Sequence, residues 1–407
     1  MLTEDLLHYI WKFQLFDSRD LKTKSGVEIQ IIDQGIYQSN AGADFENAKV
    51  KIGNITFAGN IEIHVNEAEF RAHNHHLDKA YNTVILHVVW QSANEKTVLE
   101  NGETAEVLEL KNRVNNSILT RYDFLMKQQQ AIACSSLKSD IDEFHLAHFL
   151  QKIGVERLER KVNDINALLA QFGNDFDQVV FVMLARYLGG GVNNEPMQQL
   201  AASISIKILY KNLSQPNIGE AILFGQAGLL DTETNDEHAK DLLKEYNYQK
   251  RLHDLKPLVK TVWKFAKIRP SNFPTVRIAQ LTSLINSGNF QLEKLMKMDA
   301  KLFQSSKFWK SCEPNIGKQT IEVLAINFFV PLLFAYGKYT GNEMLCDKAI
   351  NILESIFAEK NAVISQYEFL IRPNNASETQ ALLELKTNYC DKLKCLNCAV
   401  GNAILRK

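Results

Sequence analysis

The hydrophobic pattern of this chain changes period near Asn112, and that change limits the folds it can adopt more than any other feature. Before Asn112, apolar and polar residues alternate with the two-residue period of β-strands. After it, apolar residues recur at the spacing of a buried helix face. The sequence therefore predicts an α+β protein, with an α/β domain at residues 1–112 and a large all-α domain at residues 113–407.

The elements expected before Asn112 are one helix and five strands. Thr3 can cap a helix that runs to about Phe16. We expect the strands to form a mixed, mostly antiparallel meander at residues 27–31, 48–52, 55–65, 83–90 and 107–110. The main helices expected after Asn112 cover residues 119–130, 142–171, 175–188, 197–210 and 318–336.

The composition is that of an ordinary globular protein. Of the 407 residues, 45% are hydrophobic and 23% are charged, and the net charge of -1 gives no overall attraction to nucleic acid or to anionic lipid. The longest apolar stretch, residues 323–336, contains Asn327 and Pro331 and is shorter than the roughly 20 residues of a membrane helix. Glu4 and Asp5 stand where a signal peptide would be basic. We therefore expect a cytoplasmic protein with no membrane span.

Two acidic residues are expected to meet across the hairpin formed by the second and third strands. Glu62 and His64 are two positions apart, so they share one face of a strand. The turn of the hairpin brings residues 44–46 opposite residues 61–63, so Asp44 can reach Glu62. Two converging carboxylates suit Mg²⁺ or Mn²⁺, an ion that can hold a phosphate and deprotonate a water. The alternative is a half-exposed hairpin on which Glu62 and His64 face solvent.

This arrangement resembles the PD-(D/E)XK nuclease superfamily. The core of that superfamily is a helix, a three-stranded meander, a helix and a further strand, and its motif is an Asp followed on the next strand by Glu-x-Lys. The resemblance implies a nuclease-like fold in which Asp44 and Glu62 hold a catalytic divalent ion. It also implies that Glu4, on the first helix, assists them.

One position departs from the motif. His64 stands where the superfamily has lysine, and histidine can orient water or phosphate but does not carry a constant charge. Lys49 or Lys51, on the preceding strand, could supply that charge. The resemblance thus implies a metal-dependent phosphodiesterase acting on nucleic acid. The departure leaves open an inactive nuclease-like fold that binds nucleic acid, or a protein partner through its helical domain.

The whole chain also resembles a bacterial family known only as a domain of unknown function. The likeness rests on the runs AGADF, GNIEIHV, HNHHLDKAYNTVILHVV, RPSNFPTVRIAQL and YCDKLKCLNCAVGNAIL. It implies no established activity.

Five of the ten histidines lie between His64 and His87. The spacing of His73, His75 and Asp78 can ligate a transition metal. Our first interpretation is that these three residues bind phosphate or shape the cleft of a nuclease. The second is a zinc or manganese hydrolase in which His64 joins them. The third is a polar loop that covers the active face.

Three further potential ligands lie near the C-terminus. Cys390, Cys395 and Cys398 fall within nine residues, a spacing that brings sulfurs to one metal centre with little strain. We expect a structural zinc ion or iron–sulfur cluster, with the fourth ligand from Cys346 or, failing that, Cys312. The alternative is three ordinary packed cysteines.

Overall fold

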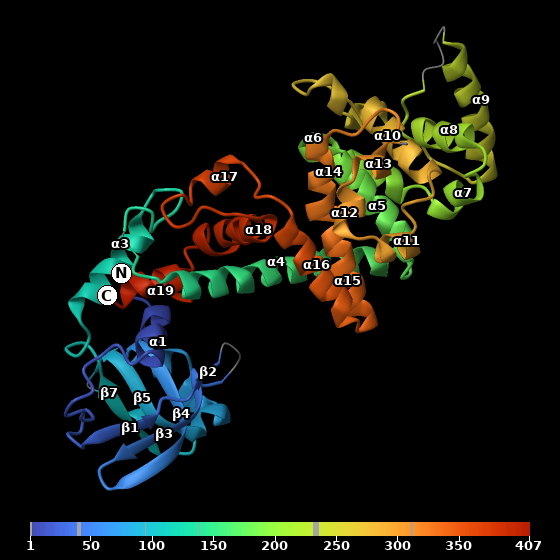
Figure 1. Cartoon of the computed structure of the whole chain (residues 1–407). Coiled ribbons are helices and arrows are strands. Elements are labelled where there is room, and N and C mark those ends of the chain that lie inside the picture. Colours follow the sequence, from blue (N-terminus) through green and yellow to red (C-terminus); the bar gives the residue numbers. More distant parts are fainter. Residues whose placement is uncertain (1, 39–41, 94, 138, 231–235, 311) are drawn as a thin grey trace. The chain divides into compact units, whose positions relative to one another are not determined.

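The computed structural model describes residues 2–38, 42–93, 95–137, 139–230, 236–310 and 312–407. By its contacts the chain divides into two compact units (Figure 1). Unit 1 comprises Met1–Phe149 with Leu385–Lys407, and unit 2 comprises Leu150–Glu384. The strands of the described residues all belong to unit 1, and the last one ends at Glu109. The predicted α+β class, with a strand-rich region followed by a large helical region, is confirmed, whereas the domains 1–112 and 113–407 stay a prediction.

Unit 1 is built on one sheet, in which seven strands lie within the described residues. Its strand order is β1-β3-β4-β5-β7-β6, and β2 also pairs with β3. The strands are β1 (Ile29–Asp33), β2 (Ile36–Tyr37), β3 (Phe45–Ile52), β4 (Ile55–Asn66), β5 (Val84–Gln91), β6 (Thr97–Val98) and β7 (Thr104–Glu109).

The sheet is mixed, and the prediction of a mostly antiparallel meander is wrong. β1, β3 and β4 are antiparallel neighbours, but β5 is parallel to β4 and β7 is parallel to β5. The β4–β5 connection holds α2 (Glu69–Ala72) and the short 3₁₀ helices η1 (His75–Leu77) and η2 (Lys79–Thr83). A connection of this length allows the chain to cross over and return in the same direction. The nearly uniform apolar character of β5 suits a strand between two parallel neighbours.

A β-bulge in β3 sets the register next to Asp44. The pairing of β3 with β4 shifts by one residue before Phe45 pairs with Ile61. Asn47 lies in the shifted segment and has a left-handed φ of 59°. Without the shift Phe45 would lie opposite Glu62, and with it Asp44 takes that place. The predicted pairing of residues 44–46 with 61–63 agrees with this register.

Helix α1 (Glu4–Lys12) connects the sheet to the C-terminal segment. The hydroxyl of Thr3 accepts a hydrogen bond from the amide of Leu6 and caps the helix, as expected. α1 contacts both β4 and η7. The guanidinium of Arg406 lies 3.8 Å from the ring centroid of Phe13, next to the end of α1. The C-terminal elements are η6 (Leu385–Cys390, a π-helix), η7 (Cys395–Asn397) and α19 (Ala399–Leu405).

In the described residues after Glu109, the regular elements are helices, apart from isolated bridges such as that between Phe357 and Asn375. α3 (Asn116–Lys127) lies in unit 1, and α4 (Glu143–Gln171) runs from unit 1 into unit 2. Unit 2 has a continuous core of its own. Its longer helices are α5 (Phe176–Leu188), α6 (Gly190–Ala202), α8 (Pro216–Gln226), α9 (Glu237–Leu252), α10 (Pro274–Asn286), α15 (Val330–Thr340), α16 (Glu343–Ser355) and α18 (Ala376–Glu384). Its shorter ones are α7 (Ile206–Lys211), η3 (Lys260–Val262), η4 (Pro270–Asn272), α11 (Leu292–Lys297), α12 (Ala300–Gln304), α13 (Ser306–Trp309), α14 (Lys318–Leu324), η5 (Ala325–Phe329) and α17 (Ala362–Ser365).

One helical stretch of unit 2 is long and apolar enough to cross a membrane, by length and composition alone. It is Lys318–Thr340, formed by α14, η5 and α15 without a break. In its most apolar window, 72% is buried inside the protein. Burial of this kind is typical of a core helix, and within that core Lys161 donates a hydrogen bond of 2.9 Å to Asn327.

Candidate metal centre

Carboxylate and imidazole side chains from several elements of unit 1 converge on one site. Two spacings explain most of the convergence: residues four apart share a helix face, and residues two apart share a strand face. The converging residues are Glu4 and His8 from α1, Asp44 from the residue before β3, Glu62 and His64 from β4, His73 and His75 from the chain around α2 and η1, and His87 from β5.

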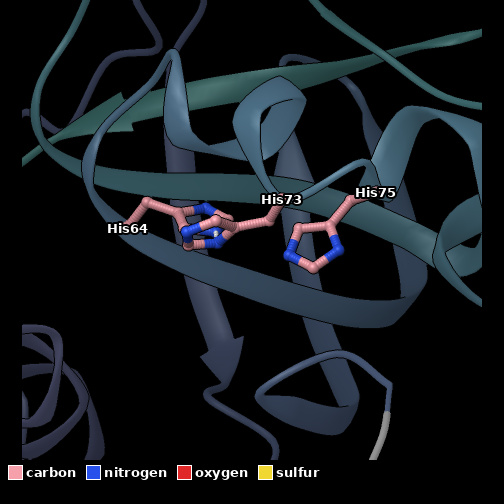
Figure 2. A group of neighbouring side chains, drawn as sticks. All are labelled: His64, His73 and His75. Atoms are coloured by element: carbon pink, nitrogen blue, oxygen red, sulfur yellow. Dashed lines mark hydrogen bonds between the residues drawn. The ribbon is translucent and has the colours of Figure 1, made fainter.

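Three of the imidazoles are close enough to share one ion (Figure 2). One ring nitrogen of each of His64, His73 and His75 lies within 4.8 Å of the others. Nε2 of His64 is 3.2 Å from Nδ1 of His73. Oε1 of Glu62 is 3.3 Å from Nε2 of His75 and 3.7 Å from Nε2 of His64. Three imidazoles and one carboxylate form a donor set suited to Zn²⁺ or another divalent transition metal, rather than to Mg²⁺, which prefers oxygen ligands.

Glu62 is a buried acid whose charge the protein stabilises poorly. Its exposed fraction is 4%. Burial raises its pKa to about 9, with further contributions from the negative charges of Asp44 and Glu4. The carboxyl group is therefore neutral at pH 7 in the metal-free protein. A divalent cation among the histidines would supply the positive charge that the ionised carboxylate lacks.

Asp44 and Glu62 are joined through the backbone. The amide of Asp44 donates to Oε2 of Glu62 at 3.2 Å, and the amide of Ile63 donates to Oδ2 of Asp44 at 2.8 Å. The same Oδ2 lies 3.2 Å from Nε2 of His8. Both ring nitrogens of His8 are buried and make no well-formed hydrogen bond within the protein. The structure thus brings the two sequence-predicted acids together and adds a histidine beside them.

His87 fixes the orientation of His64. Nε2 of His87 is 2.9 Å from Nδ1 of His64, and Nδ1 of His87 is 2.7 Å from the hydroxyl of Thr97. When His87 donates to Thr97 it accepts from Nδ1 of His64, which leaves the Nε2 lone pair of His64 directed at the other imidazoles. Burial lowers the pKa of His64 to about 2 and that of His87 to about 3, so both rings are neutral. Neutral imidazole is the form that binds a metal.

Glu4 lies at the border of this site. Burial raises its pKa, and the negative charges of Glu69 and Asp44 raise it further. The charges of His73 and His8 act in the opposite direction. This mutual influence places Glu4 near the site to which the sequence assigned it.

Two sequence-predicted site residues lie away from this site, and a third has another contact. Lys49 and Lys51 are exposed on β3 and pair with Ala58 and Thr56. These partners lie four and six residues before Glu62, about 13 and 20 Å along the strand at roughly 3.3 Å per residue. The side chain of Asp78 caps η2 by accepting a hydrogen bond of 2.9 Å from the amide of Ala80. Burial lowers the pKa of His75, and the negative charge of Asp78 acts in the opposite direction, so Asp78 lies near the site.

The three C-terminal cysteines lie beside a different fourth cysteine from the one expected. Cys390, Cys395 and Cys398 line one small cavity in unit 1, and Cys134 lines it with them. Cys346 lies in unit 2, with its sulfur 3.7 Å from the carbonyl oxygen of Phe334. Cys312 is buried in unit 2, with its sulfur 3.7 Å from the carbonyl oxygen of Gln280.

Sequence reasoning missed His8, Cys134 and the role of His87. His8 follows Glu4 by four residues on a helix, so its place on the same face could have been predicted. The sequence indicates that His87, in an apolar strand, needs a hydrogen-bonding partner, but it does not show which side chain that partner is. Cys134 is alone in its part of the sequence and gives no local signal.

A family model described as "Protein of unknown function (DUF2851)" matches residues 4–362. The match includes the acids and histidines of the site and ends before the three C-terminal cysteines. No curated protein and no solved structure shows significant similarity to the chain.

Proposed function

Since the chain belongs to the DUF2851 family, whose description assigns no function, we propose its function from the site itself: unit 1 is a phosphodiesterase that depends on a divalent transition metal and acts on nucleic acid. The observation that carries the proposal is the convergence of His64, His73 and His75 with the buried carboxyl of Glu62. Structural packing alone gives little reason to gather three imidazoles around a buried acid.

The ligands of the proposed centre are Nε2 of His64, ring nitrogens of His73 and His75, and Oε1 of Glu62. His73 is exposed and His75 is half-buried, so solvent and substrate can reach this side of the site. Mn²⁺ or Zn²⁺ bound there would polarise a phosphoryl oxygen and lower the pKa of a bound water. His64 is held for this task by His87 and Thr97, as metal-bound histidines generally are by a second hydrogen-bonding group.

Asp44 and His8 supply the proposed acid–base pair. Nε2 of His8 and Oδ2 of Asp44 are 3.2 Å apart, and their side chains are 14% and 21% exposed. A histidine beside a carboxylate can take a proton from a nucleophilic water and keep the resulting positive charge paired. The amide of Ile63 holds the carboxylate of Asp44 in place for this role.

The phosphodiester substrate is inferred from the order of the elements. If the two-residue strand β2 is left out, α1, β1, β3, β4, α2 and β5 follow the order of helix, three strands, helix and strand in the PD-(D/E)XK core. Asp44 stands before β3 and Glu62 lies on β4, an order that supports their assignment to the two motif acids. Three histidines replace the usual oxygen-rich surroundings of the ion, so we expect transition metals to support activity better than Mg²⁺.

A second candidate function is binding without cleavage. It is favoured by the residue at the position where the nuclease motif has lysine. His64 stands there, and both of its ring nitrogens already contact other imidazoles, those of His87 and His73. In that case the site would hold a metal and unit 1 would bind nucleic acid, or unit 2 a protein partner, without hydrolysis.

Metal titration followed by a cleavage assay separates these candidates. The full-length protein is titrated with Mn²⁺, Zn²⁺ and Mg²⁺ and then incubated with single- and double-stranded DNA and RNA. The variants Asp44→Asn, Glu62→Gln and His73→Ala are compared with the matched control His76→Ala. His76 is the neighbour of His75 but lines a different depression, together with Glu67 and Arg71.

We expect metal-dependent cleavage that the control keeps. Asp44→Asn should bind the metal and lose cleavage, whereas Glu62→Gln and His73→Ala should lose both. Metal binding without cleavage of any substrate would support the second candidate. No metal binding at this site would overturn both.

A further inference from the structure

The four cysteines of unit 1 meet at one place, although they come from opposite ends of the chain. Cys134 follows α3, Cys390 ends η6, Cys395 begins η7, and Cys398 is the residue before α19. All four line one cavity of about 20 Å³, together with Ala133, Tyr389, Lys394 and Gly401. None of the chain's six cysteines, which all lie in the described residues, forms a disulfide.

The local backbone is shaped for close approach of these thiols. A Cβ atom on Gly401 would lie 2.2 Å from the carbonyl oxygen of Cys395, so only glycine lets the first turn of α19 pack against η7. Leu393 adopts a left-handed φ of 50°, which turns the chain between Cys390 and Cys395. These two features fold the nine-residue cysteine segment back on itself.

Cys398 is buried and the other three cysteines are half-buried, and the thiols influence one another. Burial raises the pKa of Cys134 to about 12, and the nearby Cys390 and Cys395 raise it further. Burial also raises the pKa of Cys398 to about 12, with smaller contributions from Cys390 and Cys134 among others. Four thiols that line one cavity form a complete ligand set for a thiophilic metal.

We propose that Cys134, Cys390, Cys395 and Cys398 together bind one thiophilic metal centre, in which Cys134 is the fourth ligand. Four thiolates hold either a zinc ion or an iron–sulfur cluster. Zinc would place the sulfurs about 3.8 Å apart, from Zn–S bonds of about 2.3 Å.

The centre would join the C-terminal segment to the chain after α3. That segment already contacts α1: Arg406 lies over Phe13, and α1 contacts η7. α1 carries Glu4 and His8 on the face that meets the histidine site. A metal centre at the cysteines would therefore stabilise the helix that completes the other site, without being part of that site.

The test is elemental analysis of the full-length protein purified without oxygen. Iron, acid-labile sulfide and zinc are measured per chain in a parent protein with all six cysteines, in Cys134→Ser and Cys398→Ser, and in the matched controls Cys346→Ser and Cys312→Ser. All five proteins also carry Glu62→Gln and His73→Ala, so that zinc at the histidine site is not counted. Iron with sulfide identifies a cluster, and one equivalent of zinc identifies a single ion.

We expect one centre in the parent and both controls, and a fall to background in Cys134→Ser and Cys398→Ser. Should those two variants fail to fold, native alkylation of the parent provides the second readout: these four thiols should resist iodoacetamide until a chelator is added. The proposal is overturned if the parent contains neither iron nor zinc, or if Cys134→Ser keeps the metal centre. Because the parent lacks the histidine site, failure here leaves the proposed phosphodiesterase untouched.

Discussion

The backbone amide of Asp44 donates a hydrogen bond of 3.2 Å to Oε2 of Glu62, while the side chain of Asp44 raises the pKa of the same carboxyl group. One oxygen of Glu62 is thereby fixed, and the other faces His64 and His75. The bulge at Asn47 makes this possible, since it shifts the register so that Asp44 stands opposite Glu62. The candidate centre thus depends on one extra residue in β3.

The substitution Glu62→Gln should weaken metal binding and stabilise the metal-free protein at high pH. The pKa of Glu62 is raised to about 9, so between the pKa of the unfolded state and pH 9 the native state binds more protons than the unfolded state. Stability of the wild type therefore falls as the pH rises through this window, and the amide removes that fall. At about 1.4 kcal/mol per pKa unit, and with partial relaxation, we expect a gain of about 1 to 3 kcal/mol at pH 8.

The measurement is urea unfolding at pH 6 and pH 8 in the presence of a chelator, with a substitution of the exposed residue before β1, Glu28→Gln, as control. If Glu62→Gln is less stable than the wild type, and by the same free energy of unfolding at both pH values, then Glu62 is an ordinary hydrogen-bonded acid.

The substitution His87→Gln should reduce the loss of stability that the wild type shows as the pH falls. Burial lowers the pKa of His87 to about 3, so below about pH 6.5 the unfolded state binds a proton that the native state does not. Stability of the wild type is lost as the pH falls through this window, by at most about 1.4 kcal/mol per pH unit for this residue. Thermal unfolding between pH 5 and 7.5 tests the slope, with the exposed His253→Gln as control.

The same variant should reduce metal affinity although His87 is not a ligand. Loss of a group that orients a metal-binding histidine typically costs about 10- to 100-fold in affinity. Competition titration with a chromogenic chelator measures this change. Unaltered affinity in a folded His87→Gln would contradict the orienting role that we assign to His87.

Lys49→Ala and Lys51→Ala should leave metal affinity and cleavage unchanged. Both side chains are exposed on β3, and Lys49 lines a broad depression of about 950 Å³ together with Phe57 and Asn60. Neither lies opposite Glu62. Metal titration and the cleavage assay on both variants check this. A loss of cleavage with metal binding intact would restore the sequence-based expectation that one of these lysines acts at the site.

Glu384→Ala should destabilise unit 2 without changing the metal centre. Glu384 accepts hydrogen bonds from Arg157 at 3.2 Å and from Arg160 at 2.7 Å, and its side chain is 5% exposed. Removing it leaves the half-buried Arg157 without this partner, which typically costs about 3 to 5 kcal/mol. Unfolding curves and metal affinity should be measured together, with the exposed Glu354→Ala as control. A normal unfolding curve would contradict a structural role for this network.

Local sequence features predicted much of unit 1. The alternation of residues 48–65 and the turn within it gave the β3–β4 hairpin, and the cap at Thr3 gave α1. The parallel placement of β5 was missed because an apolar strand specifies burial on both faces but not the direction of its neighbours. The short strands β2 and β6 were missed because two residues carry no periodic signal.

The site was predictable to the extent that its residues are close in sequence. Glu62 and His64, and His73 and His75, stand two apart, so their spacing marked them. Their joining into one centre depends on the path of the β4–β5 crossover, which no local pattern encodes. Cys134 shows the same limit, since only the folded chain brings it to the three C-terminal thiols.

The most direct test of the central claim is anomalous diffraction from crystals of the full-length protein grown with Mn²⁺, and separately with Zn²⁺. We predict one strong anomalous peak per chain in unit 1, within coordination distance of Nε2 of His64, ring nitrogens of His73 and His75, and Oε1 of Glu62. Crystals in which these side chains keep their contacts with one another and show no peak, in both metals, would contradict the account.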